Sequence, residues 1–327
     1  MTPALLEVED LVVQYPVARG IVGTVARRPR TTVHAVDGVS FTLAPGEMVA
    51  LVGESGCGKT STAQAVMRLV DPEAGSIRFE GRDLTAIGPR ELRPLRRRIQ
   101  MVYQDPYESL NPRQRVRQAV EEPLAIHRLG GSRVERARRV REALERVELT
   151  PADLFLDRYP HELSGGQRQR VAIAAALVLE PVLLVADEPV SMLDVSVRAG
   201  VLTLLDRLRR SGLAILMITH DLSTAARFAD RIAVMYLGRI VEEGPASAVV
   251  QTPQHPYTKA LLSVVPRRDP RERHQGLILR GETPDAVQLP TGCRFHPRCP
   301  LAVPACRADE PVLAPTPAGH RAACLLV

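Results

Sequence analysis

The residues from Gly53 to Thr60 read Gly-Glu-Ser-Gly-Cys-Gly-Lys-Thr and fit the pattern G-x-x-x-x-G-K-[ST] of a phosphate-binding loop. Glycine lets the backbone wrap closely around phosphate groups, with its N–H groups directed inward. Lys59 is expected to reach the β- and γ-phosphates, and the hydroxyl of Thr60 is expected to ligate Mg²⁺. The alternative is a chance glycine-rich turn. The predicted nucleotide-binding residues of this loop are Gly53, Glu54, Ser55, Gly56, Cys57, Gly58, Lys59, Thr60 and Ser61.

Two acidic residues, Asp187 and Glu188, follow the apolar run 182–186. Mg²⁺ prefers oxygen ligands and usually keeps several waters, so Asp187 is expected to hold the metal through water. Glu188 is expected to lie beside the γ-phosphate and to act as general base toward the attacking water. Alone, two acids after a strand can equally mark a turn or the start of a helix. Together with the lysine-bearing loop, they predict hydrolysis of a nucleoside triphosphate.

Short apolar runs surround these residues in strand–helix–strand order. The run 48–52 leads directly into the glycine-rich loop, and residues 61–69 are expected to form a helix after it. A helix over about 195–210 connects two buried strands, and such a crossover predicts a parallel sheet. The sequence therefore predicts an α/β fold, with strands at 5–15, 39–43, 48–52, 182–186 and 213–219.

Two stretches between these elements differ in character. Residues 16–33 contain proline, glycine and several arginines and are predicted to be a loop. Residues 106–163 have helical periodicity and predict a helical subdomain, in which Ser132 and Glu135 have the spacing of a capping box. The predicted buried face of that helix consists of Val134, Ala137, Val140, Leu144 and Val147.

The five cysteines are unevenly placed. Cys57 lies inside the phosphate loop, where it is either a small filler or, near a helix N-terminus, a reactive thiol. Four thiols in a proline-rich extension suit an iron–sulfur cluster or Zn²⁺, although paired C-x-x-C knuckles are absent; a metal-free extension is the third alternative. His296 and His320 are weaker candidate ligands. The extension begins at about residue 251, and its cysteines are Cys293, Cys299, Cys306 and Cys324.

Composition limits the class of protein. The 327 residues are 45% hydrophobic and 24% charged, which predicts two or three globular units and excludes global disorder. The net charge of +6 suits a phosphate-bearing ligand or an anionic membrane surface. Aromatic residues make up only 3%, which argues against a stacking platform for single-stranded nucleic acid. No apolar run approaches the roughly 18 residues of a membrane span and the N-terminus has no basic leader, so an intracellular protein is expected.

Further motifs resemble those of the ATP-binding cassette (ABC) proteins. Residues 163–167, Leu-Ser-Gly-Gly-Gln, resemble the family signature, and Gln104 in Val-Tyr-Gln-Asp-Pro resembles its Q-loop. Residues 191–194, Ser-Met-Leu-Asp, resemble its D-loop. His220 resembles its switch histidine, and Tyr15 stands where the family places an aromatic residue that stacks on adenine; a core histidine and a strand residue are the alternatives. The resemblance adds as nucleotide contacts Tyr15, Ser164, Gly165, Gly166, Gln167 and Asp194, and as catalytic residues Gln104, Glu188 and His220, with Gln104 also a ligand of Mg²⁺.

The resemblance implies an ABC-type fold over residues 1–250. In this fold a RecA-like parallel-sheet core carries an antiparallel β subdomain and an inserted helical subdomain. It also implies a mechanism in which Ser164, Gly165 and Gly166 cap the γ-phosphate of a second subunit, so that two ATP molecules lie between the subunits. Hydrolysis then leaves products whose charges repel each other at the interface between the subunits, and the subunits separate. Gln104 would sense the γ-phosphate and relay its state to the helical subdomain.

The sequence is more closely similar to the ATP-binding subunits of bacterial dipeptide and oligopeptide importers. Residues 105–113 resemble their extended Q-loop region, residues 255–262 the start of their C-terminal extension, and residues 292–300 its close. This resemblance implies a [4Fe–4S] cluster on the four cysteines of residues 251–327. Implied partners are a second ABC ATPase subunit in a heterodimer, two transmembrane permease subunits and an extracytoplasmic solute-binding protein. The implied location is peripheral, on the cytoplasmic face of the cell membrane, with no nucleic-acid partner.

Other functions stay open at this point. The same ATPase could drive uptake of nickel or another small solute, because other chains choose the substrate. A soluble ABC ATPase acting on nucleic acid or ribosomes commonly has tandem cassettes or long coiled coils, and this sequence has neither. A non-catalytic regulatory module is disfavoured by the presence of Glu188.

Overall fold

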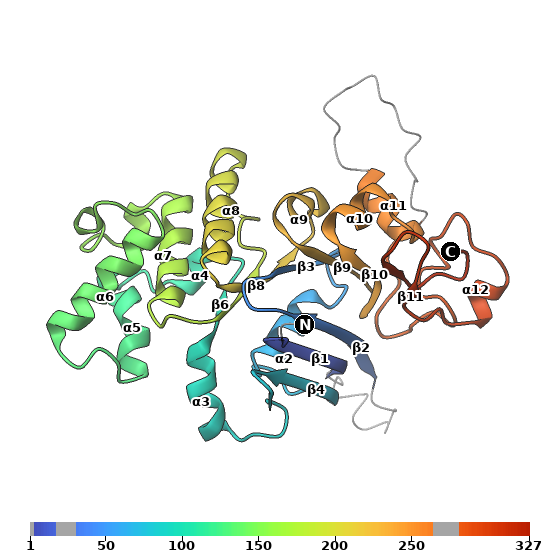
Figure 1. Ribbon diagram of the computed structural model, residues 1–327, viewed down its shortest axis with the longest axis horizontal. Coiled ribbons are helices and arrows are strands. Elements are labelled where there is room, and N and C mark those ends of the chain that lie inside the picture. Colours follow the sequence, from blue (N-terminus) through green and yellow to red (C-terminus); the bar gives the residue numbers. More distant parts are fainter. Residues whose placement is uncertain (1–2, 18–30, 264–280) are drawn as a thin grey trace, which may run out of the picture. The chain divides into compact units, whose positions relative to one another are not determined.

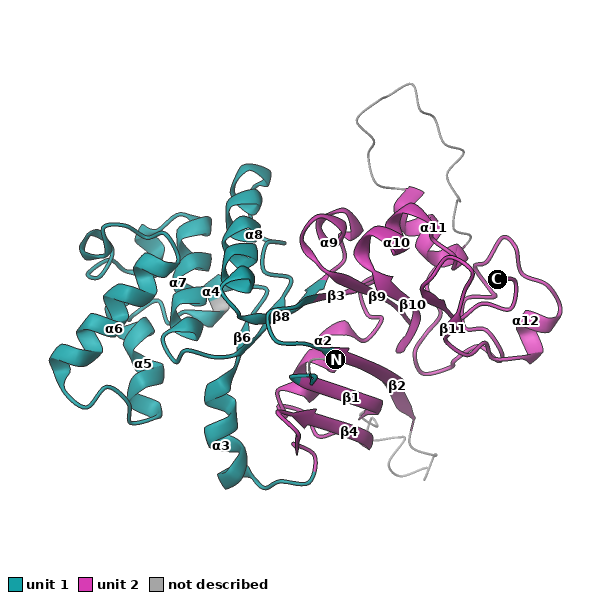
Figure 2. Ribbon diagram, viewed as in Figure 1, with its two compact units in different colours: residues 1–5, 43–48, 86–218 teal, residues 6–42, 49–85, 219–327 magenta. Residues whose placement is uncertain are grey.

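The computed structural model describes residues 3–17, 31–263 and 281–327. The chain forms two compact units, drawn in teal and magenta in Figure 2. The first unit holds residues 1–5, 43–48 and 86–218, and the second holds residues 6–42, 49–85 and 219–327. Most of the loop predicted at 16–33 lies outside the described residues, as does part of the proline-rich extension.

The first unit contains three parallel strands, with β7 (Leu183–Asp187) paired to both β6 (Ile99–Val102) and β8 (Ala214–Thr219). Every residue of β7 and β8 is buried, as expected for apolar strands covered on both faces. The predicted parallel sheet is therefore confirmed. The α-helices of this unit, labelled in Figure 1, are α3 (Pro89–Arg98), α4 (Pro106–Ser109), α5 (Val116–Ile126), α6 (Arg133–Arg146), α7 (Gly165–Leu177) and α8 (Val195–Arg210). The unit also contains two short 3₁₀ turns, η1 (Ala152–Leu154) and η2 (Pro160–Glu162).

The helical subdomain follows the predicted pattern with two differences. Ser132 caps α6, because its hydroxyl accepts a hydrogen bond from the Glu135 N–H at 3.1 Å. The Glu135 carboxylate does not complete the predicted capping box; it pairs with Arg138 and Arg139 on the next turn. Val134 was predicted on the buried face but is 80% exposed; it lies in the first turn of α6, whereas the buried residues of that helix are Val140, Ala143 and Leu144.

The second unit contains two groups of paired strands. One is antiparallel, in the order β2 (Thr32–Leu43), β1 (Leu6–Pro16), β4 (Ala74–Phe79) and β5 (Arg82–Asp83). In the other, β3 (Met48–Val52) runs parallel to β9 (Arg231–Tyr236), and β9 pairs antiparallel with β10 (Arg239–Pro245). Strand β2 begins well before the predicted 39–43, and the predicted helix after the glycine-rich loop is α2 (Lys59–Val66). The other helices are α9 (Leu222–Phe228), α10 (Ala246–Gln251), α11 (Pro256–Ser263) and α12 (Ala305–Ala308).

The C-terminal extension shares a core with the strands of this second unit. Its last strand pair, β11 (Ala314–Pro315) and β12 (Arg321–Ala322), continues the pairing from β10. The buried rings of Tyr257 and Phe295 lie 4.8 and 5.2 Å from the ring of Tyr236 on β9. The extension is thus held by aromatic packing and main-chain pairing.

Candidate functional site

The glycine-rich loop begins where the buried strand β3 ends and leads into α2. A Cβ on Gly53 would lie 2.3 Å from the carbonyl oxygen of Met235, so only glycine fits there. Gly58 caps α2 with φ of +105°, and a Cβ on it would lie 2.1 Å from the carbonyl oxygen of Ala35. The close packing around these two glycines fixes the path of the loop.

Lys59 is buried at the start of α2, and its ammonium closes the loop on itself. Nζ donates hydrogen bonds to the carbonyl oxygens of Gly53 at 2.7 Å and Glu54 at 2.8 Å. Thr60, the next residue, is exposed, as the predicted metal-binding hydroxyl requires. Cys57 is buried, and burial raises the pKa of its thiol, which favours the interpretation of this residue as a filler.

Glu54 has partners that the sequence pattern did not reveal. Its carboxylate receives hydrogen bonds from the Arg298 guanidinium at 2.7 and 3.2 Å and from the Thr283 hydroxyl at 2.8 Å. Although burial favours the protonated form, these partners hold the pKa of Glu54 below its usual range. No local signal could have found these contacts, because Arg298 lies 244 residues away along the chain.

The predicted acidic pair lies at the carboxyl end of β7. Asp187, the last residue of the strand, is buried, and Glu188 follows it with φ of +44°. The Glu188 N–H donates a hydrogen bond to the carbonyl oxygen of Ile218 on β8 at 2.9 Å, which anchors this turn. The hydroxyl of Ser191 donates to the Glu188 carbonyl at 3.1 Å and joins the D-loop residues to the same turn.

Gln104 follows β6, the strand beside β7, and its side chain contacts Glu188, the second residue of the acidic pair. Its amide nitrogen donates a hydrogen bond to the Glu188 carboxylate at 3.2 Å. The next residue, Asp105, caps α4 by accepting a hydrogen bond from the Tyr107 N–H at 2.7 Å. Two of the three predicted catalytic residues, Gln104 and Glu188, are therefore in contact.

The residues 164–167 form the start of α7. Ser164 and Gln167 make a capping box: the Gln167 N–H donates to Ser164 Oγ at 3.3 Å, and the Ser164 N–H donates to Gln167 Oε1 at 3.0 Å. A Cβ on Gly166 would lie 2.2 Å from Val197 Cγ1, so the glycine lets α7 approach α8 closely. The N–H groups at the start of a helix carry partial positive charge, which suits an anionic ligand.

The remaining predicted nucleotide contacts lie on three different elements. Tyr15 is a half-buried residue near the end of β1, and Asp194 lies at the N-terminus of α8. His220 is exposed and follows the buried strand β8. The phosphate loop, Tyr15 and His220 belong to the second unit, whereas Gln104, Asp187, Glu188, Asp194 and the residues 164–167 belong to the first.

The four cysteines of the extension do not form a metal site in the part of the chain that the structure describes. No group of three or more His, Cys, Asp or Glu side chains there is arranged to hold a metal ion. Burial, together with the other thiols, raises the pKa of Cys293 to about 11. His320 is not a spare ligand, because its Nε2 lies 2.7 Å from the buried Glu242 carboxylate. The expected iron–sulfur or zinc centre is therefore not supported by this arrangement.

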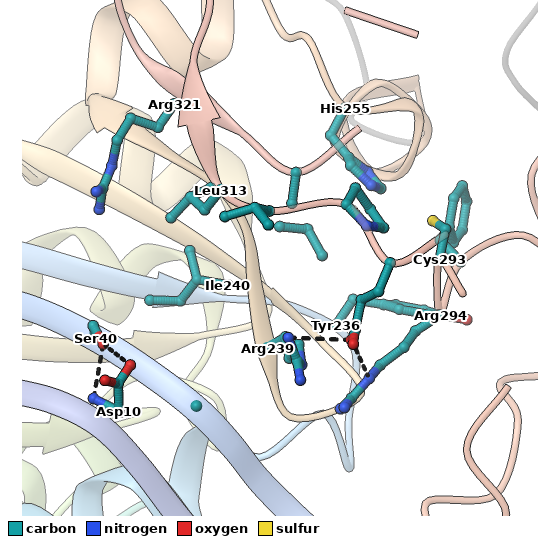
Figure 3. Close-up of a pocket in the computed structure, with 17 residues that line it drawn as sticks. Asp10, Ser40, Tyr236, Arg239, Ile240, His255, Cys293, Arg294, Leu313 and Arg321 are labelled. Carbon is teal, nitrogen blue, oxygen red and sulfur yellow. Dashed lines mark hydrogen bonds and ion pairs between the residues drawn. The ribbon is translucent and has the colours of Figure 1, made fainter. Parts of the chain in front are cut away.

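A pocket of 380 Å³ lies in the second unit, between β1, β2, β9, β10 and the extension (Figure 3). Glu310 on its wall pairs with Arg239 at 3.1 Å, and Asp10 accepts a hydrogen bond from Ser40 at 3.1 Å. Cys293 also lines it, whereas no residue of the phosphate loop does. The pocket is thus distinct from the predicted phosphate site.

Two sequence families and many proteins match the chain. The family described as ABC transporter matches residues 36–191, and the one described as oligopeptide/dipeptide transporter, C-terminal region, matches residues 241–306. A probable peptide ABC transporter ATP-binding protein of Sinorhizobium fredii is 47% identical over 325 residues, which cover 99% of this chain and 90% of that protein. The chain belongs to the ABC transporter ATP-binding proteins.

Other relatives and structures agree with this assignment. The oligopeptide transport ATP-binding protein AppF of Bacillus subtilis is 44% identical, over 98% of this chain and 97% of that protein. A solved dimeric ATP-binding cassette in a post-hydrolysis state with ADP and Pi has a TM-score of 0.63 and 28% identity, covering 74% of this chain and 98% of that one. CbiO1 of Clostridium perfringens, part of an ABC transporter complex, has a TM-score of 0.64 and 30% identity, covering 76% and 91%.

Membership in this family confirms the predicted fold class and the ATPase activity. The ABC transporter match contains the phosphate loop, Gln104, the residues 164–167 and Glu188. Within the described residues, no helix of this ATP-binding protein has both the length and the apolar composition needed to cross a bilayer.

Proposed function

We propose that this ABC ATPase powers the import of dipeptides or oligopeptides through a membrane permease. The observation that carries the proposal is the similarity over nearly the whole chain to ATP-binding proteins named for peptide transport, extension included. ATP is the substrate, and the products are ADP and phosphate.

The phosphate loop binds ATP, and Lys59 contacts its β- and γ-phosphates. The oxygen donors of Thr60, Gln104 and Asp187 suit Mg²⁺, which neutralises phosphate charge when bound. Glu188 takes a proton from the attacking water as general base. The hydrogen bond from Gln104 supports this role, because it orients the Glu188 carboxylate. His220 is proposed as the switch histidine, and Tyr15 as the residue that stacks on adenine.

A second ABC subunit completes the site. The N-terminus of α7, capped by Ser164, binds the γ-phosphate held by the partner. Asp194, at the N-terminus of α8, is a further proposed nucleotide contact. The similarity to solved dimeric cassettes supports this arrangement. We propose a heterodimer on the cytoplasmic face of the membrane, with two permease subunits and an extracytoplasmic solute-binding protein. The cassette itself spans 1–250 and the extension 251–327.

The four-cysteine module is a separate part of the proposal. The arrangement of the described cysteines does not support a metal centre, so the proposal that the module binds a [4Fe–4S] cluster, with Zn²⁺ as the alternative, rests on the resemblance alone. No step of the mechanism depends on it. Iron, sulfide and zinc assays on anaerobically purified protein decide the matter. Protein that is fully folded without iron, sulfide or zinc would remove this part.

Uptake assays test the transport function. Membranes containing this protein should yield a complex with two permease subunits, and cells carrying the complex should accumulate labelled peptides. Replacement of Glu188 by Gln should abolish the accumulation without dissociating the complex. Accumulation of nickel but not of peptides would instead favour the small-solute alternative.

A further inference from the structure

The phosphate-loop residue Glu54 is held at two points by the C-terminal extension, and all residues involved belong to the second unit. Its main-chain N–H donates a hydrogen bond to the Tyr257 hydroxyl at 2.9 Å, across 203 positions of sequence. Its carboxylate pairs with Arg298 at 2.7 Å and accepts a hydrogen bond from Thr283. Main chain and side chain of one loop residue thus depend on a segment far away in sequence.

Two partners of Glu54, Tyr257 and Arg298, are largely removed from water, whereas Thr283 is exposed. Tyr257 is fully buried, and the Arg298 side chain is 8% exposed. Two guanidinium nitrogens of Arg298 contact the two carboxylate oxygens of Glu54, at 2.7 and 3.2 Å. Such two-point pairing of charged groups is stronger and more directional than an ion pair at the surface.

These partners are themselves fixed in place. Glu242 on β10 accepts hydrogen bonds from the N–H groups of Gln254 at 2.7 Å and His255 at 3.0 Å, which sets the start of α11 just before Tyr257. The Arg298 N–H donates a hydrogen bond to the carbonyl oxygen of Phe295 at 3.0 Å, and the ring of Phe295 packs on Tyr236 of β9. Tyr257 and Arg298, which contact Glu54, are therefore held in place by hydrogen bonds and ring packing within the second unit.

We propose that Arg298 and Tyr257 are positioning residues for the phosphate loop, and this proposal rests on the ATPase function proposed above. Glu54 is the only acidic residue between Gly53 and Ser61. A carboxylate in a loop that binds a polyphosphate repels its ligand unless a cation compensates it. Arg298 supplies that cation, and Tyr257 fixes the main chain of the same residue. The extension thereby sets the affinity of the loop for ATP.

The test is a titration of the full-length protein with a fluorescent ATP analogue and Mg²⁺. Arg298→Gln should weaken binding roughly tenfold, and Tyr257→Phe, which removes only a hydroxyl, about threefold. Arg298→Gln combined with Glu54→Gln should bind more tightly than Arg298→Gln alone, because the uncompensated charge is gone. Arg307→Gln changes an exposed arginine of the same extension and should bind as the unaltered protein does.

Thermal unfolding identifies any variant that fails to fold, and Tyr257→Phe then carries the test because its shape is conserved. Unchanged affinity in folded Arg298→Gln and Tyr257→Phe would overturn the proposal. A double variant no better than Arg298→Gln would overturn the charge compensation. Lys59→Ala distinguishes failure of the proposed ATP site from failure of this inference. If Lys59→Ala binds the analogue normally, the proposed ATP site itself is wrong. If Lys59→Ala does not bind the analogue but Arg298→Gln binds it normally, only this inference is removed.

Discussion

The side-chain amide of Gln104 donates a hydrogen bond to the Glu188 carboxylate, with 3.2 Å between nitrogen and oxygen and 84 positions between the residues. The two residues follow β6 and β7, which are neighbouring parallel strands, so their carboxyl ends meet at one edge. The Glu188 N–H is anchored on Ile218 of β8. The proposed base therefore has a fixed main chain and an oriented side chain.

Replacement of this base gives the first prediction. Glu188→Gln keeps the size and the contact to Gln104 but cannot take a proton from water. We expect kcat for ATP hydrolysis to fall by about 10²–10⁴-fold, with ATP binding retained and ATP-bound dimers accumulating. Phosphate release and size-exclusion chromatography measure both effects. Hydrolysis at the normal rate would show that another group is the base.

Lys59→Ala is expected to weaken ATP binding by roughly ten- to a hundredfold, because a charge-assisted contact to phosphate is lost. Isothermal titration calorimetry gives the dissociation constant directly. Lys259→Ala is the matched control, since Lys259 is the only other lysine of the chain and lies on α11 outside the loop. Equal affinities of the two variants would discredit the phosphate-loop assignment.

Gly166→Ala tests the close approach of α7 to α8. The added methyl group would come within 2.2 Å of Val197 Cγ1, so we expect the free energy of unfolding to fall by about 1–3 kcal/mol. Val197→Ala removes the opposing methyl groups and should restore much of that loss in the double variant. Urea unfolding measures all three proteins. Equal stability of Gly166→Ala and the unaltered protein would mean that the two helices can move apart at no cost.

His255 predicts a loss of stability in acid. Burial, with a smaller effect of Lys259, lowers the pKa of His255 from 6.5 to about 3, and its Nδ1 accepts a hydrogen bond from the Tyr257 N–H at 3.0 Å. Between pH 6.5 and 3 the unfolded chain therefore binds one more proton than the folded chain. Stability is fully present above this window and falls by up to about 1.4 kcal/mol per pH unit as the pH is lowered through it.

The measurement is urea unfolding at several pH values between 7 and 4. His255→Asn offers a side-chain oxygen as acceptor and does not titrate, so its stability should depend less steeply on pH. Parallel curves for the two proteins would show that the His255 side chain takes no part in the acid response.

Local patterns were sufficient for much of the fold. The helix predicted over 195–210 is α8. The glycine-rich loop lies between β3 and α2 as predicted, and its close contacts with Met235 and Ala35 explain why two of its positions are glycine. The buried strands could also be predicted, because a short continuous apolar run in an α/β protein is typical of a strand covered by helices on both faces.

Features that depend on tertiary contacts could not be predicted. The exposure of Val134 depends on which turns of α6 are packed against the rest of the fold, and the partners of Glu135 depend on rotamers along α6. The contacts of Glu54 with Tyr257 and Arg298 join positions more than 200 residues apart, as only the folded chain can. The pairing of His320, a candidate metal ligand, with Glu242 is likewise a contact between distant parts of the sequence and could not be predicted.

The attachment of Glu54 to Arg298 and Tyr257 also limits how the cassette can be shortened or exchanged. A truncated protein that ends at about residue 250 would keep the Glu54 carboxylate and lose both Tyr257 and Arg298, which hold Glu54 in place. Chimaeras that graft this nucleotide-binding region onto another transporter should therefore carry their own tail with it, or replace Glu54 by a neutral residue at the outset.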